Sequence, residues 1–150
     1  MVQDIHQLGL ECDQRLPKVT QQNAWGQTSN DLYVCSAWKQ QKKISAEEGV
    51  VAIGYERKYS EWSRIYQFTK LFLYAPSSGL YSCPIAMTDG AAKTIESLGL
   101  KDQMFFQQIY QKLISRDSNQ FWTSGQWMTE KRGGSDVGSY IKCSSFDLDH

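Results

Sequence analysis

The chain has 150 residues, the size of one domain that buries about two-thirds of its unfolded surface around a single core. Its 16 basic and 16 acidic side chains cancel, so no global field gathers nucleic acid, anionic lipid or an acidic partner. No stretch approaches the roughly 20 apolar residues that span a bilayer, and residues 1–20 fit neither a secretory signal nor a transit peptide. We expect a soluble intracellular protein, with no preference among mitochondrion, peroxisome and cytoplasm.

The four cysteines, Cys12, Cys35, Cys83 and Cys143, are spread along the chain with no two closer than 23 positions. This spacing fits neither a metal-ligand pattern nor a dense disulfide framework. We therefore expect no metal site and reduced, structural thiols, since free cysteine behaves as a small buried hydrophobe. A single reactive thiol is the alternative, and nothing in the sequence singles one out.

The first third of the chain is polar and irregular. Residues 4–14 could form a short helix, after which we expect a loop that includes the turn-rich stretch 23–30. A helical pattern then begins at Asp31, capped by Asp31 or Asn30. A second helix is expected over residues 45–57, because Ser45 and Glu48 form a capping box.

Three further helices are predicted from apolar residues that recur at three- and four-residue spacing. The first begins at Ser60 and ends before Pro76, and the second closes at Gly99. The third covers residues 101–116. We expect their apolar faces to form the core: Trp62, Ile65, Tyr66, Thr69, Phe72 and Leu73; Leu80, Pro84, Met87, Ala91, Ile95 and Leu98; and Met104, Phe105, Ile109 and Leu113.

The tail changes character at Phe121. Residues 121–129 are rich in aromatic, Thr and Gly residues, which indicates one extended segment, and residues from Gly133 onward are rich in Gly, Ser and Asp. A single strand leaves a ladder of backbone groups unpaired, so the sequence is expected to stop at the edge of a second domain.

Residues 126–138 carry the clearest signal for chemistry. An extended strand end offers backbone donors and acceptors, the Thr129 hydroxyl can donate and accept, and the paired glycines Gly133 and Gly134 allow close approach of a bulky ligand. These properties suit a planar heterocycle with a phosphate tail. Taken without any family pattern, Gly133–Asp136 is more often a plain turn.

Two segments resemble the acyl-CoA dehydrogenase family. Met128–Asp136 matches the family motif Met/Val-Thr-Glu-x-x-x-Gly-Ser-Asp without a gap. Upstream, Ser82–Ala92 looks like the Cys-Pro-x-x-Met-Thr segment of the branch that includes the AidB-like, adaptive-response proteins. The resemblance covers roughly residues 20–138 and departs from the family in the tail from Ser139 onward.

The resemblance implies a mainly α fold, a helical bundle of the acyl-CoA dehydrogenase N-terminal domain that ends in the first strand of an absent middle β-domain. Residues 1–120 would hold the partial helical domain, 121–138 the start of the β-domain, and 139–150 a divergent tail. Glu130 and Asp136 would support the loop rather than act as a base. The implied FAD contacts are Gln126, Trp127, Met128, Thr129, Gly134 and Ser135, and the implied substrate contacts are Ser135, Met87 and Thr88.

The family oxidises acyl-CoA to 2,3-enoyl-CoA: a carboxylate abstracts the α-proton while hydride passes to flavin N5. That base comes from a later helical region, so we expect no catalytic residue in this chain, which would be inactive alone, and a homo-oligomer for the complete protein. One alternative is a non-catalytic helical interaction module. Another is an AidB-like DNA-associated fragment, although the zero net charge argues against nucleic acid.

Overall fold

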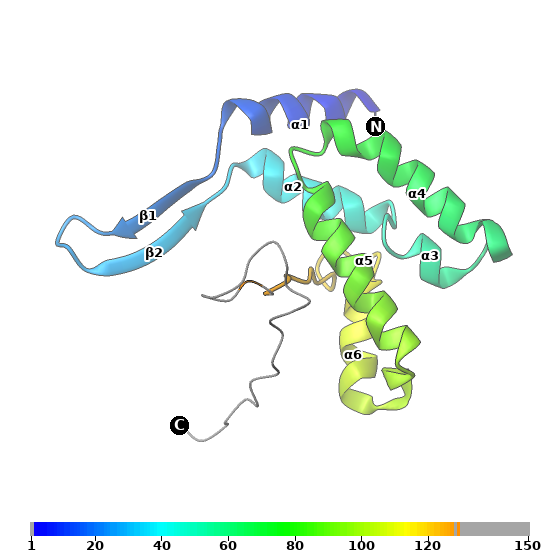
Figure 1. The fold of residues 1–150 in the computed structure, drawn as a ribbon. Helices are drawn as coiled ribbons and strands as arrows, with labels where there is room; N and C mark the ends of the chain where they lie inside the picture. Colours follow the sequence, from blue (N-terminus) through cyan, green and yellow to red (C-terminus); the bar gives the residue numbers. More distant parts are fainter. Residues whose placement is uncertain (1, 128, 130–150) are drawn as a thin grey trace, which may run out of the picture.

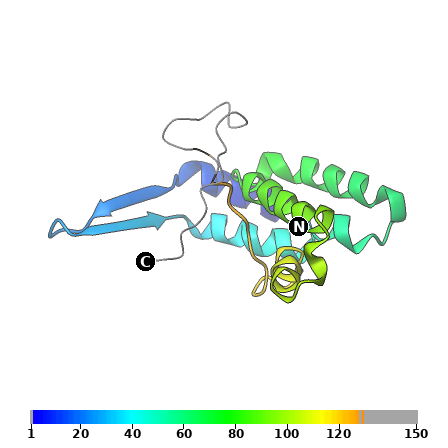
Figure 2. The same ribbon diagram turned by 60° about the horizontal axis from the view of Figure 1, so that its bottom comes forward.

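The computed structural model describes residues 2–127 and 129, which fold into a mostly helical body with one projecting β-hairpin (Figures 1 and 2). The mainly α class expected from the sequence is thereby confirmed. The elements in chain order are α1 (Val2–Gln14), β1 (Lys18–Gln22), β2 (Thr28–Tyr33), α2 (Ser36–Glu47), α3 (Ile53–Glu56), η1 (Ser60–Trp62), α4 (Ser63–Tyr74), η2 (Ala75–Ser77), α5 (Ser82–Ser97), η3 (Leu100–Asp102) and α6 (Met104–Leu113).

The hairpin was not predicted. β1 and β2 pair antiparallel, with Lys18 opposite Tyr33 and Val19 opposite Leu32. Nearly every strand residue is exposed, so the sequence lacks the alternation of apolar and polar residues that marks a half-buried strand. The loop expected over this stretch and the helix expected from Asp31 are therefore wrong, since β2 runs to Tyr33 and α2 begins at Ser36.

α2 continues through Ser45 rather than beginning there. The Ser45 hydroxyl is buried and donates to the backbone carbonyl of Lys42 at 2.9 Å, so it caps no helix. The helix ends at Glu47, and the left-handed Gly49 (φ 62°) just beyond it lets the following amide of Val50 bond back to Ser45 O at 3.0 Å. The capping box expected at Ser45 is therefore wrong. In place of the helix expected over residues 45–57, the structure has the end of α2 and the short helix α3.

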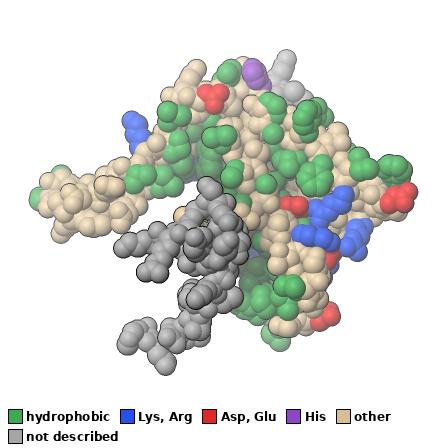
Figure 3. All heavy atoms as spheres, viewed as in Figure 1, with side chains coloured by type: hydrophobic (Ala, Val, Ile, Leu, Met, Phe, Trp, Pro, Cys, Tyr) green, Lys and Arg blue, Asp and Glu red, His purple; other side chains and the backbone are tan. Residues whose placement is uncertain are grey.

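α4 begins and ends near the expected positions, but its apolar face is not buried. Its buried side chains are Ser63, Gln67 and Tyr74. The apolar residues predicted as core are largely exposed, with Phe72 at 77% and Leu73 at 72%. Figure 3 shows apolar side chains along α4 on this face of the molecule, with a group of Lys and Arg side chains beside them.

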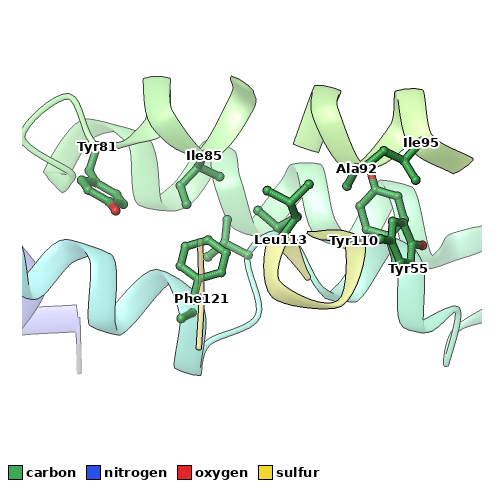
Figure 4. Packing of buried hydrophobic residues seen from close by; sticks show 11 residues of the cluster. Tyr55, Tyr81, Ile85, Ala92, Ile95, Tyr110, Leu113 and Phe121 are labelled. Atoms are coloured by element: carbon green, nitrogen blue, oxygen red, sulfur yellow. The ribbon is translucent and has the colours of Figure 1, made fainter. Parts of the chain in front are cut away.

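The main core lies between α2, α3, α5 and α6. On α5 the buried face is rotated from the expected one by one residue, and α6 buries Tyr110 and Leu113 while Met104 and Phe105 stay exposed. Figure 4 shows the α5 side chains pointing toward Phe121, Leu113 and the edge-to-face pair Tyr55–Tyr110. The buried cluster consists of Ala46, Val50, Val51, Tyr55, Tyr81, Ile85, Ala92, Ile95, Tyr110, Leu113 and Phe121.

After α6, residues 121–127 run along the body without joining a sheet. The two-stranded β1–β2 hairpin is the one sheet of the described residues. Phe121 anchors the segment in the core at 2% exposure, and the amide of Trp122 donates to Lys112 O at 3.1 Å. No helix in the described part of the chain is long and apolar enough to cross a membrane.

Candidate functional site

The candidate flavin-contacting residues fall partly outside the described residues. Met128, Gly134 and Ser135 lie outside them. Gln126 and Thr129 are exposed, and Trp127 is 98% exposed. The described part of the motif is therefore open to solvent, which leaves its polar and aromatic groups available to a ligand.

A groove lies between the upstream motif and the segment that leads into the downstream one. It has a volume of about 470 Å³ and lies between α5, α6 and the 121–127 segment. It is lined by Met87, from the upstream motif, and by Gln126, two residues before the downstream motif begins. An apolar floor with a few polar groups at one edge is typical of small-molecule sites. The lining residues are Met87, Ala91, Thr94, Ile95, Ile109, Leu113, Trp122, Thr123, Ser124 and Gln126.

Thr88, predicted as a substrate contact, lies behind this groove instead of facing it. Its side chain is fully buried. Its hydroxyl donates to the carbonyl of Pro84 at 2.7 Å and accepts from the amide of Ser124 at 3.0 Å. The geometry therefore gives Thr88 a positioning role: it fixes the 121–127 segment to α5, so that Met87 and Gln126 meet.

A polar network that the sequence did not reveal holds α4 against α5. Arg64 donates to the Asp89 carboxylate at 2.7 Å, and Gln67, which is buried, donates to the same oxygen at 3.0 Å. Arg64 also stacks over the Tyr55 ring at 4.4 Å. Burial is the largest influence on Tyr55 and raises the pKa of its phenol, so the protonated hydroxyl donates to Asp89 O at 2.6 Å. The Asp89 side chain thus neither lines the groove nor is freely solvated.

A positively charged side chain, Lys112, lies beside the groove and contacts one of its lining residues, Trp122. The Lys112 ammonium lies 4.0 Å from the centre of the Trp122 ring, a cation–π contact that fixes both side chains. A cation beside an apolar groove is chemically suited to a ligand that combines an apolar chain with anionic groups. No local sequence pattern marks this pair, because Lys112 and Trp122 belong to different elements.

Glu96, near the end of α5, forms the centre of a second charged cluster. It accepts hydrogen bonds from Lys101 at 2.6 Å, Arg57 at 2.8 Å and Lys93 at 3.0 Å. Burial pushes the pKa of Glu96 upward, but the bonds from Lys101 and Lys93 and the charge of Arg57 outweigh it and lower the pKa to about 2. The cluster ties α3, α5 and η3 together and is structural.

Nothing in the described residues suggests a metal centre, because no group of three or more His, Cys, Asp or Glu side chains is gathered there.

Comparison with known proteins identifies the fold. No family model matches the chain. The protein "Acyl-CoA dehydrogenase family member 11" of Caenorhabditis elegans is 49% identical over 137 residues. The crystal structure of Caenorhabditis elegans ACDH-11 in complex with C11-CoA superimposes with a TM-score of 0.83 at 48% identity. The fold is that of the N-terminal helical domain of an acyl-CoA dehydrogenase.

The apo form of Bd2924 is a second structural relative, with a TM-score of 0.81 and 42% identity. The matches cover 89–91% of this chain but only part of each relative: 22% of the curated protein, 23% of the ACDH-11 chain and 27% of the Bd2924 chain. The chain thus spans about a quarter of the length of these relatives.

Proposed function

We propose that this chain is the N-terminal part of an FAD-dependent acyl-CoA dehydrogenase of the AidB-like branch, and that it contributes one wall of the flavin and acyl-CoA site. The observation that carries the proposal is the groove that places Met87 and Gln126 on one surface. Met87 belongs to the upstream motif and Gln126 lies two residues before Met128 of the downstream one, so the shared groove supports a common site for the two.

The residues of the groove suit this ligand pair. An acyl chain needs an apolar wall, which Met87, Ala91 and Ile109 provide. A nucleotide cofactor with phosphates needs donors and positive charge, which the polar edge at Ser124 and Gln126 and the nearby Lys112 offer. FAD, when bound, would supply the redox chemistry by accepting hydride from the acyl chain.

The role of this chain is to position the flavin and the acyl-CoA and to exclude water from their site. We assign the Thr129 hydroxyl to a hydrogen bond with the flavin ring and Met128, Gln126 and Trp127 to contacts along that ring. Gly134 and Ser135 are assigned to the phosphate or CoA end, and Met87 to the acyl chain. The catalytic base is assigned to the part of the complete protein that follows this chain, and the chain alone is proposed to be inactive.

The exposed face of α4 supports a specific part of this proposal. Trp62, Ile65, Phe72 and Leu73 are each more than half exposed, and an apolar surface of this kind marks a contact with other protein. We propose that the remainder of the complete protein covers it. The second candidate function, a non-catalytic helical module that binds a separate protein, uses the same face.

A chimera distinguishes the two candidates. Residues 1–138 of this chain would replace the matched region of the Caenorhabditis elegans relative, and the purified chimera would be tested for flavin absorbance and for its loss on anaerobic mixing with C11-CoA. The proposal expects bound flavin that acyl-CoA reduces. A folded chimera that binds no flavin would contradict the proposal and favour the interaction module.

A further inference from the structure

Two buried thiols lie in contact at the base of the hairpin. Cys12 belongs to the last turn of α1, and Cys35 is the residue directly before α2. Their sulfur atoms are 3.9 Å apart, although the residues are 23 positions apart in the sequence. Both cysteines are free in the structure, and their proximity in space could not be seen from their spacing along the chain.

A groove lies against the buried thiol pair. It has a volume of about 260 Å³ and is lined by both cysteines and by residues of α1, β2 and α2. Cys12 is 7% exposed and Cys35 is 2% exposed, so the groove is the route by which a small oxidant would approach the pair. Gly79 lines the same groove, and an added Cβ there would lie 2.5 Å from the Cβ of Cys12.

The geometry is close to that of a disulfide. The sulfur atoms must approach from 3.9 Å to about 2.05 Å, a change that side-chain rotation can supply when the two backbones are already adjacent. α1 and α2 pack directly on one another, so the backbones are adjacent here.

We propose that Cys12 and Cys35 form a reversible oxidation site, in which a small hydroperoxide converts the two thiols into a disulfide. With hydrogen peroxide, one thiolate attacks an oxygen, the O–O bond breaks, and the sulfur becomes a sulfenic acid while hydroxide leaves and takes up a proton to become water. The second thiolate then attacks that sulfur and expels hydroxide, which takes up a proton to become a second water. Two thiols lose two electrons and two protons, and hydrogen peroxide is reduced to two waters.

At neutral pH the two thiols react slowly with peroxide, but they can still be oxidised. Burial first, and then the hydrogen bond and charge of Cys35, raise the pKa of the Cys12 thiol to about 11. Since the thiolate is the nucleophile, brief exposure to peroxide leaves the pair reduced, and sustained or alkaline exposure oxidises it.

The disulfide would clamp the base of the hairpin. Residues 12–35 form the closed loop, and this loop contains all of β1 and β2. The bond would join α1 directly to the start of α2 and fix the direction in which the hairpin projects (Figure 1). Closing such a loop restricts the unfolded chain, so the oxidised protein should be more stable than the reduced one.

The test treats the purified 150-residue chain with hydrogen peroxide at pH 8.5 and maps the products by non-reducing peptide mass spectrometry. We expect one cross-linked peptide pair that contains Cys12 and Cys35, reversed by dithiothreitol. The matched control is Cys83→Ser, which removes an exposed thiol and should leave the product unchanged. Cys35→Ser should abolish it.

Thermal unfolding supplies the second measurement. The oxidised chain should unfold roughly 5–10 °C above the reduced chain, and dithiothreitol should remove the difference. Since an unfolded chain would pair its four cysteines indiscriminately, mixed cross-links that include Cys83 or Cys143 would overturn the proposal. Cross-links that form only in urea, or a disulfide that fails to raise the unfolding temperature, would overturn it as well.

Discussion

The hydroxyl of Thr88, in the middle of α5, accepts a hydrogen bond from the backbone amide of Ser124 at 3.0 Å. The two residues are 36 positions apart, and the bond is what aligns the 121–127 segment with the helix. Because Thr88 is fully buried, its hydroxyl cannot be replaced there by water without a rearrangement.

Replacing Thr88 by Val should therefore destabilise the chain by about 1–3 kcal/mol, since the amide of Ser124 would be left without its acceptor. Urea unfolding followed by circular dichroism measures the change. Thr94→Val is the matched control, because Thr94 makes the same type of bond to the carbonyl four residues earlier, at 2.9 Å, but is exposed. Equal effects of the two substitutions would contradict the special role of Thr88.

Thr129 tests the assignment of the flavin contact. In the chimera described above, Thr129→Val keeps the size of the side chain and removes the hydroxyl, so flavin reduction by acyl-CoA should slow by roughly tenfold to a hundredfold. Stopped-flow absorbance measures the rate. Thr69→Val is the control, because Thr69 is exposed on α4, away from the groove. A flavin-loaded Thr129→Val chimera that is reduced at the original rate would show that the assignment is wrong.

The Arg64–Asp89 pair should matter more than an ordinary surface pair. The atoms lie 2.7 Å apart, the side chains are 32% and 19% exposed, and Gln67 shares the same carboxylate oxygen. We expect Arg64→Met to cost about 1–3 kcal/mol of unfolding free energy. Arg15→Met should cost less than about 0.5 kcal/mol, because Arg15 is 63% exposed and lies 3.4 Å from Glu11. Similar losses for both variants would refute this ranking.

The low pKa of Glu96 predicts an acid-sensitive contribution to stability. Its pKa is about 2 in the folded chain and near 4.5 when unfolded, so the contribution is complete above about pH 4.5 and is lost as the pH falls toward 2. Glu96→Gln should flatten the dependence of the unfolding free energy on pH between about 5 and 2, by about 1–3 kcal/mol in total. Glu47→Gln is the control for loss of an exposed pair: its side chains are 51% and 64% exposed, so the substitution should change the unfolding free energy at pH 7 by less than about 0.5 kcal/mol.

A substitution on the exposed face of α4 should have different effects in the isolated chain and in the chimera. Phe72→Ala should change the stability of the isolated chain by less than about 0.5 kcal/mol, since Phe72 is 77% exposed. In the chimera, the same substitution should cost about 2–4 kcal/mol, because the proposal places other protein on that face. Leu113→Ala, in the core at 3% exposure, should destabilise both proteins and serves as the control.

The sequence predicted the helices better than their buried faces. For α4, α5 and α6, apolar periodicity gave the approximate positions, Pro76 and Gly99 gave boundaries, and the left-handed Gly99 (φ 66°) closes α5 as expected. Periodicity shows that a helix has an apolar face but not what covers that face. On α4 two of the three buried positions are Ser63 and Gln67, which no hydrophobicity pattern would select; the third is Tyr74.

The site was predicted in part for a related reason. Met87 and Gln126 line the same groove, and their roles as ligand contacts stay a prediction. Thr88 was placed in the wrong role because one residue along a helix changes the direction of the side chain by about 100°. The Arg64–Asp89 and Cys12–Cys35 contacts join separate elements, and spacing along one chain does not encode them.

Thr88 and Asp89 are neighbours in the chain, yet their side chains bond to different parts of the molecule. Thr88 holds the 121–127 segment, whereas Asp89 is held by Arg64 and Gln67 of α4. One turn of α5 thus connects the wall of the groove to the exposed helix α4. A substitution at this turn acts on the 121–127 segment and on α4 at the same time.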